Sequence, residues 1–149
     1  MTPKKTVYYT DPLNEDFAEN KIKTSSVGQD FLYLRRSLIW NGCARFLYYV
    51  IAIPIVYLIS KLYLGVRFEN RRAARKLRGG FLYANHTRSL DAFIPALCAY
   101  PHRAFIIANP DAVSIPFLRN IVMMLGAIPV PTETHAYQSF RKAITKNCR

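Results

Sequence analysis

Residues 81–97 read FLYANHTRSLDAFIPAL, and the short apolar run that opens this stretch stops at an asparagine and a histidine. The run FLYA, residues 81–84, follows two glycines and predicts a buried strand. Asn85 and His86 would then lie at the carboxyl end of that strand, where parallel α/β folds bind their ligands. Asp91 follows five residues after the histidine and is predicted to lie in the first turn of a helix.

The sequence around this stretch alternates between strand and helix patterns. The helix that follows is predicted to bend at Pro95 and to end near Tyr100. The later predicted elements are a strand at 103–108, a helix at 115–125, a strand at 126–130 and a helix at 135–146. This order predicts an α/β fold with a mostly parallel sheet and flanking helices. Residues 111–131 are apolar, but Arg119 at their centre favours a buried core position over a membrane span.

The segment before the α/β pattern is the most apolar part of the chain. Residues 46–59 carry no charged side chain, and the apolar stretch continues with two interruptions to residue 66. A helix across the hydrocarbon core needs about twenty residues. We therefore expect one or two membrane-associated helices: a marginal transmembrane helix kinked at Pro54, or a pair at about 31–44 and 46–64 in one leaflet. A buried helix of a soluble protein is the alternative.

Charge divides the chain of 149 residues, whose formal net charge is +12. Residues 1–30 are nearly neutral and polar and predict a mobile N-terminal segment. Residues 31–66 are expected to anchor the chain to a membrane, and residues 67–149 to form the α/β domain. Six Arg or Lys residues between Arg67 and Arg78 follow the apolar segment directly. They predict attraction to anionic headgroups and a cytoplasmic α/β domain, although such a run is also typical of a solvated helical face.

Other functional classes fit the composition less well. A basic chain can bind nucleic acid, but here the basic residues adjoin an apolar segment and no nucleic-acid motif is present, so we expect no nucleic-acid partner. The three cysteines, Cys43, Cys98 and Cys148, are far apart and odd in number. They predict reduced thiols in a cytosolic environment, with neither a metal site nor a disulfide framework.

The spacing of His86 and Asp91 suits proton transfer. A carboxylate that accepts a hydrogen bond from one imidazole nitrogen fixes the tautomer and leaves the other nitrogen free as a base. With an ordinary pKa of about 6.5, an imidazole can take a proton from an alcohol that attacks an acyl group. The alternative is structural: His86 would cap the end of a strand or helix, and Asp91 would stabilise the positive end of a helix dipole.

Asn85, His86 and Asp91, between an apolar strand pattern and an apolar helix pattern, resemble the first motif of the glycerolipid acyltransferase family. The best-known members of this family are the 1-acyl-glycerol-3-phosphate acyltransferases. The stretch FIIANPDAVSIPFLRNIVMMLGAIPV, residues 105–130, is similar to the family's segment leading to its second motif. The resemblance covers about residues 46–147.

The resemblance implies an O-acyltransferase of phospholipid biosynthesis. His86 would be the general base that deprotonates a lysophospholipid hydroxyl, and Asp91 would orient it. The acyl thioester of acyl carrier protein or coenzyme A would be the co-substrate, with no cofactor and no metal. Asn85, Arg88 and Ser89 would bind substrate, and the other partner would be membrane phospholipid.

The chain departs from the family pattern at several positions. Arg88 stands where the family often has serine, and Thr132 holds the place of an arginine that binds the acceptor phosphate. The third motif, Glu-Gly-Thr, and the fourth are absent. Either the chain is C-terminally truncated, which we expect, or acceptor binding is done differently, with Arg88, Arg103 or Arg141 as the phosphate partner. Two hypotheses stay open: an active acyltransferase, and a non-catalytic membrane-bound remnant or lipid-binding protein of the same fold.

Overall fold

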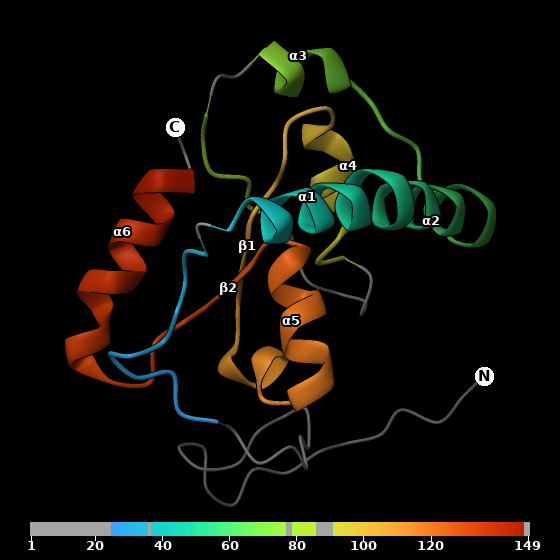
Figure 1. Ribbon diagram of the computed structural model, residues 1–149. Helices are drawn as coiled ribbons and strands as arrows, with labels where there is room; N and C mark the ends of the chain where they lie inside the picture. Colours follow the sequence, from blue (N-terminus) through green and yellow to red (C-terminus); the bar gives the residue numbers. More distant parts are fainter. Residues whose placement is uncertain (1–24, 36, 77–78, 86–90, 148–149) are drawn as a thin grey trace, which may run out of the picture.

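The computed structural model describes residues 25–35, 37–76, 79–85 and 91–147 (Figure 1). The predicted N-terminal segment is therefore described only from Ser25 onward. Three of the predicted site residues, His86, Arg88 and Ser89, lie outside the described residues.

A single long helix, Leu38–Tyr63, runs across the molecule (Figure 1). It consists of α1 (Leu38–Phe46), η1 (Leu47–Ala52), α2 (Ile53–Leu58) and η2 (Ile59–Tyr63), in which η1 and η2 are π-helical. Its 26 residues are long and apolar enough to cross a membrane, the one such helix in the described part of the chain. The predicted pair of helices is wrong, because residues 31–35 are not helical and nothing interrupts the helix at residue 45.

Local sequence explains how the long helix starts and how it passes Pro54. Ser37 caps its N-terminus, and its Oγ accepts a hydrogen bond from the Trp40 N–H at 3.4 Å. Pro54 lacks an N–H, but it lies in the first turn of α2 directly after the π-helical η1. Wide π turns are where helices absorb such irregularities, so the helix continues through the proline.

One side of the long helix faces the rest of the molecule. Its buried residues are Ala44, Tyr48 and Ser60, and the spacings between them are multiples of four residues. An α-helix has 3.6 residues per turn, so residues four apart drift slowly around it. The π segments contain more residues per turn and offset that drift, which keeps the buried residues on one side. Tyr48 Oη accepts a hydrogen bond from the Ala104 N–H at 3.0 Å, and Tyr49 Oη donates one to the Pro101 carbonyl at 3.0 Å.

The sheet of the described residues has two parallel strands, β1 (Ile106–Ala108) and β2 (Ala127–Pro129). Ile106 pairs with Ala127 in register, and the connection between the strands contains η3 (Pro110–Val113) and α5 (Pro116–Met124). This is the predicted order of strand, helix and parallel strand. The mixed architecture of helices and a small parallel sheet therefore confirms the α/β prediction in part.

The predicted strand at residues 81–84 is wrong. These residues form no strand, and their side chains are exposed, with Phe81 at 61% and Tyr83 at 92%. An apolar run becomes a strand only where another strand offers its backbone groups. In the described sheet β1 and β2 pair with each other, and residues 81–84 pair with neither.

Three further helices complete the described fold: α3 (Arg71–Lys76), α4 (Ile94–Ala99) and α6 (Tyr137–Asn147), with the 3-10 turn η4 (Thr134–Ala136) before α6. Helix α6 confirms the last predicted helix within two residues. Pro95 lies in the first turn of α4, where a proline is tolerated, so the predicted bend is absent. Asp91 lies in a turn before α4 and not inside its first turn.

The core is small and is closed by a segment far away in the sequence. Its buried hydrophobic members include Val27, Leu97, Val113, Ile128, Ala136 and Ala143. Val27 donates its N–H to Thr132 Oγ1 at 2.9 Å and accepts a hydrogen bond from the Thr132 N–H at 3.2 Å. Helix α5, in contrast, has no buried residue, so the expectation that all of residues 111–131 lie in the core is wrong.

Candidate functional site

Asn85 and Asp91 line one pocket of about 200 Å³. The walls come from three parts of the chain: the segment 82–85, Asp91 in the turn before α4, and helix α4 itself. The lining residues are Leu82, Tyr83, Ala84, Asn85, Asp91, Ile94, Pro95 and Cys98. The structure therefore brings together the two described residues of the predicted motif, which are six positions apart.

Helix α4 positions one wall of this pocket by its helical spacing. Ala96 and Leu97 are buried and anchor the helix in the core. Ile94 and Cys98 are four residues apart, so they lie on the same side of the helix, and both line the pocket. The pocket wall and the core contact are thus two faces of the same short helix.

The pocket combines apolar walls with two polar side chains. Leu82, Ile94 and Pro95 contribute apolar surface, whereas Asn85 and Asp91 contribute an amide and a carboxylate. Ligand sites commonly have this composition, in which apolar walls hold the ligand and a few polar groups orient it. Residues 82–84 of the apolar run, which forms no strand, line the pocket instead.

Of the predicted site residues, the structure brings Asn85 and Asp91 to one pocket, while His86, Arg88 and Ser89 lie outside the described residues. The contact between His86 and Asp91 therefore stays a prediction. Sequence reasoning missed the apolar lining residues. The four-residue spacing of Ile94 and Cys98 was a usable signal for one wall. The lining role of residues 82–84 had no signal apart from the strand pattern.

Arg103, predicted as a phosphate partner, holds the core together instead. Its guanidinium donates a hydrogen bond to the Met124 carbonyl at 2.6 Å and lies over the Phe105 ring at 4.9 Å and the Tyr48 ring at 5.5 Å. Burial lowers the pKa of Arg103 below its ordinary value. Arg103 is not among the described residues that line the Asn85–Asp91 pocket.

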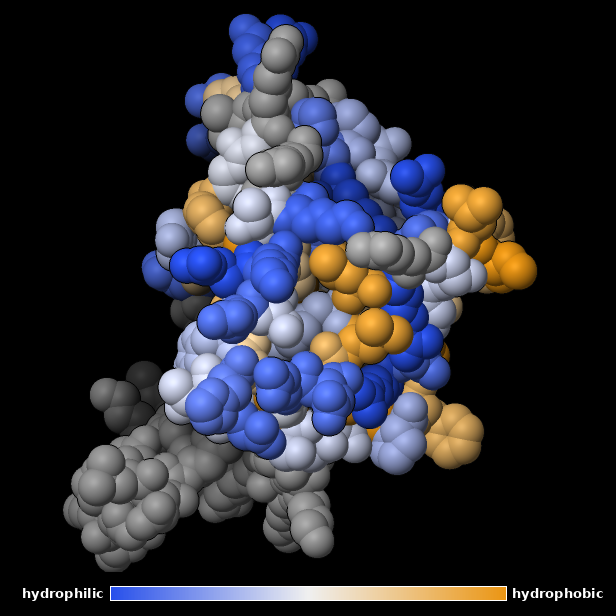
Figure 2. Space-filling model, turned by 60° about the vertical axis from the view of Figure 1, so that its left-hand side comes forward, coloured by the Kyte–Doolittle hydropathy of each residue, from blue (hydrophilic) through white to orange (hydrophobic). Residues whose placement is uncertain are grey.

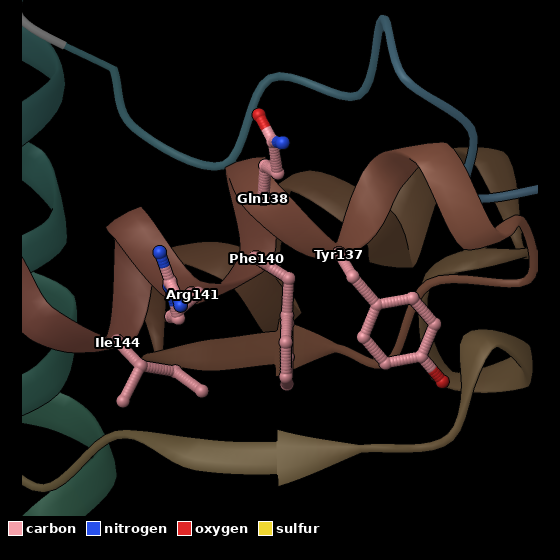
Figure 3. Close-up of a pocket in the computed structure, with 5 residues that line it drawn as sticks. All are labelled: Tyr137, Gln138, Phe140, Arg141 and Ile144. Carbon is pink, nitrogen blue, oxygen red and sulfur yellow. The ribbon is translucent and has the colours of Figure 1, made fainter.

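Arg141 and Thr132 are also placed by the structure. Arg141 lines a separate pocket of about 420 Å³ on α6, together with Tyr137, Gln138, Phe140 and Ile144 (Figure 3). Figure 3 shows Tyr137, Phe140 and Ile144 pointing to one side of the helix. Thr132, which holds the place of the family's phosphate-binding arginine, instead joins Val27 through two hydrogen bonds.

The described residues show whether side chains gather that could bind a metal, and whether the cysteines are paired. Among them, no group of three or more His, Cys, Asp or Glu side chains could hold a metal ion. Cys43 and Cys98 are free thiols, and Cys148 lies outside the described residues.

Comparison with protein families gives one match, to the model named Acyltransferase, over residues 65–149. The match covers more than half of the chain and includes the Asn85–Asp91 pocket, both strands, α5 and α6. The chain belongs to the acyltransferase family. This confirms the resemblance to glycerolipid acyltransferases and supports a transferase function. Comparison with curated proteins and with solved structures finds no significant match to either.

Proposed function

We propose that the protein is an O-acyltransferase of phospholipid biosynthesis that acts at the cytoplasmic face of a membrane. It moves an acyl chain from the thioester of acyl carrier protein or coenzyme A to the hydroxyl of a lysophospholipid such as 1-acyl-glycerol-3-phosphate. The observation that carries the proposal is the pocket shared by Asn85 and Asp91 inside the region that matches the acyltransferase family. Its apolar walls suit an acyl chain, and its polar groups suit the reacting ester.

In the proposed reaction, the His86 imidazole accepts the proton of the acceptor hydroxyl, and Asp91 orients the imidazole. The hydroxyl oxygen attacks the thioester carbonyl carbon and forms a tetrahedral intermediate. The carbon–sulfur bond then breaks, and the thiolate leaves and takes up the proton held by His86. The products are an ester and a free thiol, with no acyl-enzyme intermediate. Asn85, Arg88 and Ser89 hold the substrate.

The proposed membrane contact is monotopic, with the long helix lying in one leaflet. Tyr48 and Tyr49 hydrogen-bond to the backbone of Ala104 and Pro101, and α2 packs against α4. If the helix crossed the bilayer, these contacts would bring loop backbone into the hydrocarbon, where unsatisfied polar groups cost several kcal/mol each. A helix lying in the interface keeps the contacts on one side and lipid on the other. Its exposed apolar side chains include Leu38, Ile39, Phe46, Val50, Ile51, Ile55, Leu58 and Leu62.

The proposed base is tested by substituting His86. His86→Ala should lower the rate of acyl transfer from acyl-coenzyme A to lysophosphatidic acid by about 10²–10⁴-fold, the usual contribution of a general base. Asp91→Asn should also lower the rate, because the amide can present an N–H to the ring and favour the wrong tautomer. The measurement is phosphatidic acid formed over time by the purified full chain in mixed micelles.

His135→Ala is the matched control, because His135 is exposed in η4 and does not line the pocket. It should retain the wild-type rate. A His86→Ala variant as fast as wild type would overturn the assignment of the base. A wild-type chain that binds lysophosphatidic acid without forming product would overturn the enzymatic proposal and match the non-catalytic alternative.

A further inference from the structure

Helix α5 presents an apolar face away from the protein. Phe117 is 91% exposed, and Leu118 and Ile121 are each 45% exposed. At about 100° per residue, these three side chains fall within an arc of roughly 100° on the helix. Large apolar side chains gathered on one exposed face indicate a surface that another apolar phase covers.

Two polar side chains of α5 are held by the protein. The Arg119 guanidinium lies over the Phe31 ring at 4.8 Å, and Asn120 Oδ1 accepts a hydrogen bond from the Arg35 guanidinium at 3.2 Å. Arg119 is two residues from Phe117 and from Ile121, so it lies about 160° around the helix from either. The charge that would oppose contact with lipid is therefore turned away from the apolar face.

Helix α5 adjoins the long helix. Helix α5 packs against α1, and Figure 1 shows it extending away from the long helix at that end of the molecule. The outward side of α1 is itself apolar, with Leu38 and Ile39 among its most exposed side chains. Figure 2 shows apolar side chains standing exposed among hydrophilic ones on the surface.

We propose that the outward face of α5, formed by Phe117, Leu118 and Ile121, is a second lipid-binding surface that inserts beside the long helix into the same anionic leaflet. This inference rests on the monotopic contact of the proposed function. With the long helix alone in the leaflet, the α/β domain could still rotate about the axis of that helix. A second contact through α5 would fix this rotation. The rotation determines which way the Asn85–Asp91 pocket faces.

Charge favours a lipid surface over a second copy of the chain as the occupant. The chain carries a net charge of +12, and Arg45 lies in the last turn of α1, the helix that packs against α5. Two such chains repel each other, whereas anionic headgroups attract basic residues. Trp40, Tyr57 and Tyr63 on the long helix are of the types that favour the boundary between headgroups and acyl chains.

The test uses the full chain and vesicles of phosphatidylcholine and phosphatidylglycerol. Phe117→Ser should lower the partition coefficient in a flotation assay by about tenfold, since exposing a side chain of this size again costs about 1.5 kcal/mol or more. Tyr137→Ser is the matched control, because Tyr137 is 52% exposed on α6 and should leave partitioning unchanged. A Phe117→Trp, Trp40→Phe chain should also show quenching of its fluorescence by brominated lipid.

The outcomes separate this inference from the proposed function. Loss of binding in Phe117→Ser together with quenching at position 117 supports the second surface. The second surface is overturned if Phe117→Ser partitions like wild type, or if a tryptophan at position 117 is not quenched. If Leu62→Ser still weakens binding in that case, the contact of the long helix with lipid stands. Wild-type chain that does not float with any vesicle overturns both. Self-association that disappears in Phe117→Ser, without any effect on flotation, assigns the face to a second copy and overturns the lipid assignment.

Discussion

Gly126 is the residue at which β2 can begin. Its φ is +101°, a backbone conformation that side chains with a Cβ rarely adopt, and a Cβ there would lie 2.8 Å from the Ala104 carbonyl oxygen. Its own carbonyl accepts the hydrogen bond of the Ile106 N–H at 2.9 Å. The close approach of the segment at Gly126 to the segment at 104–106 therefore requires glycine.

We expect Gly126→Ala to lower the free energy of unfolding by about 1–3 kcal/mol, the cost of holding an unfavourable backbone conformation against a close contact. Urea unfolding followed by circular dichroism measures the change. Gly42→Ala is the control, because Gly42 lies in α1 with open space around its Cβ position. That variant should stabilise the helix by about 0.5–1 kcal/mol. Equal effects of the two substitutions would contradict the proposed role of Gly126.

The candidate site shows which residues a sequence can assign. The motif spacing indicated Asn85 and Asp91, and both line one pocket. Arg103 carries a charge suited to phosphate, but the structure engages it with the Met124 carbonyl and two aromatic rings. Residue type alone does not distinguish a basic side chain that binds a ligand from one that ties the core together.

At the scale of elements, the long helix has two sides with different roles. Tyr48 is buried on the inward side and accepts the hydrogen bond of the Ala104 N–H, whereas Tyr63 is exposed near the end of the helix. The inward side therefore contributes to folding, and the outward side is available to lipid. A deletion of the whole helix would remove both roles at once.

Single substitutions separate the two sides. Tyr48→Phe should lower the free energy of unfolding by about 1–3 kcal/mol, because the part-buried Ala104 N–H loses its acceptor. Thermal or urea unfolding in detergent gives the value. Tyr63→Phe, at an exposed position on the same helix, should leave stability unchanged. If Tyr48→Phe were equally neutral, the hydrogen bond between Tyr48 and Ala104 would not contribute to stability.

At the scale of the whole molecule, the positive charge and the apolar surfaces act together. The chain carries +12, while the long helix and α5 expose apolar side chains. Electrostatic attraction is screened by salt, since the Debye length falls from about 10 Å at 0.1 M to about 3 Å at 1 M. Burial of apolar surface in lipid is not screened in this way.

We therefore expect 1 M sodium chloride to weaken binding to anionic vesicles without abolishing it. Flotation with vesicles of phosphatidylcholine and phosphatidylglycerol at low and high salt measures the two parts. Vesicles of phosphatidylcholine alone are the control and should show little dependence on salt. Complete release from anionic vesicles at 1 M salt would contradict insertion of the apolar helix.

The sequence by itself determined the motif, the basic and apolar segments, and the local order of strand, α5, strand and α6. It did so because helix and strand periods and turn residues act between near neighbours in the chain. Only the tertiary structure decided where the apolar side chains point. Residues 82–84 line a pocket and form no strand, α5 faces outward, and one helix replaces the predicted pair. The reason is physical: an apolar side chain gains equally from a core, a pocket or a lipid surface, and distant segments such as Val27 determine which one it meets.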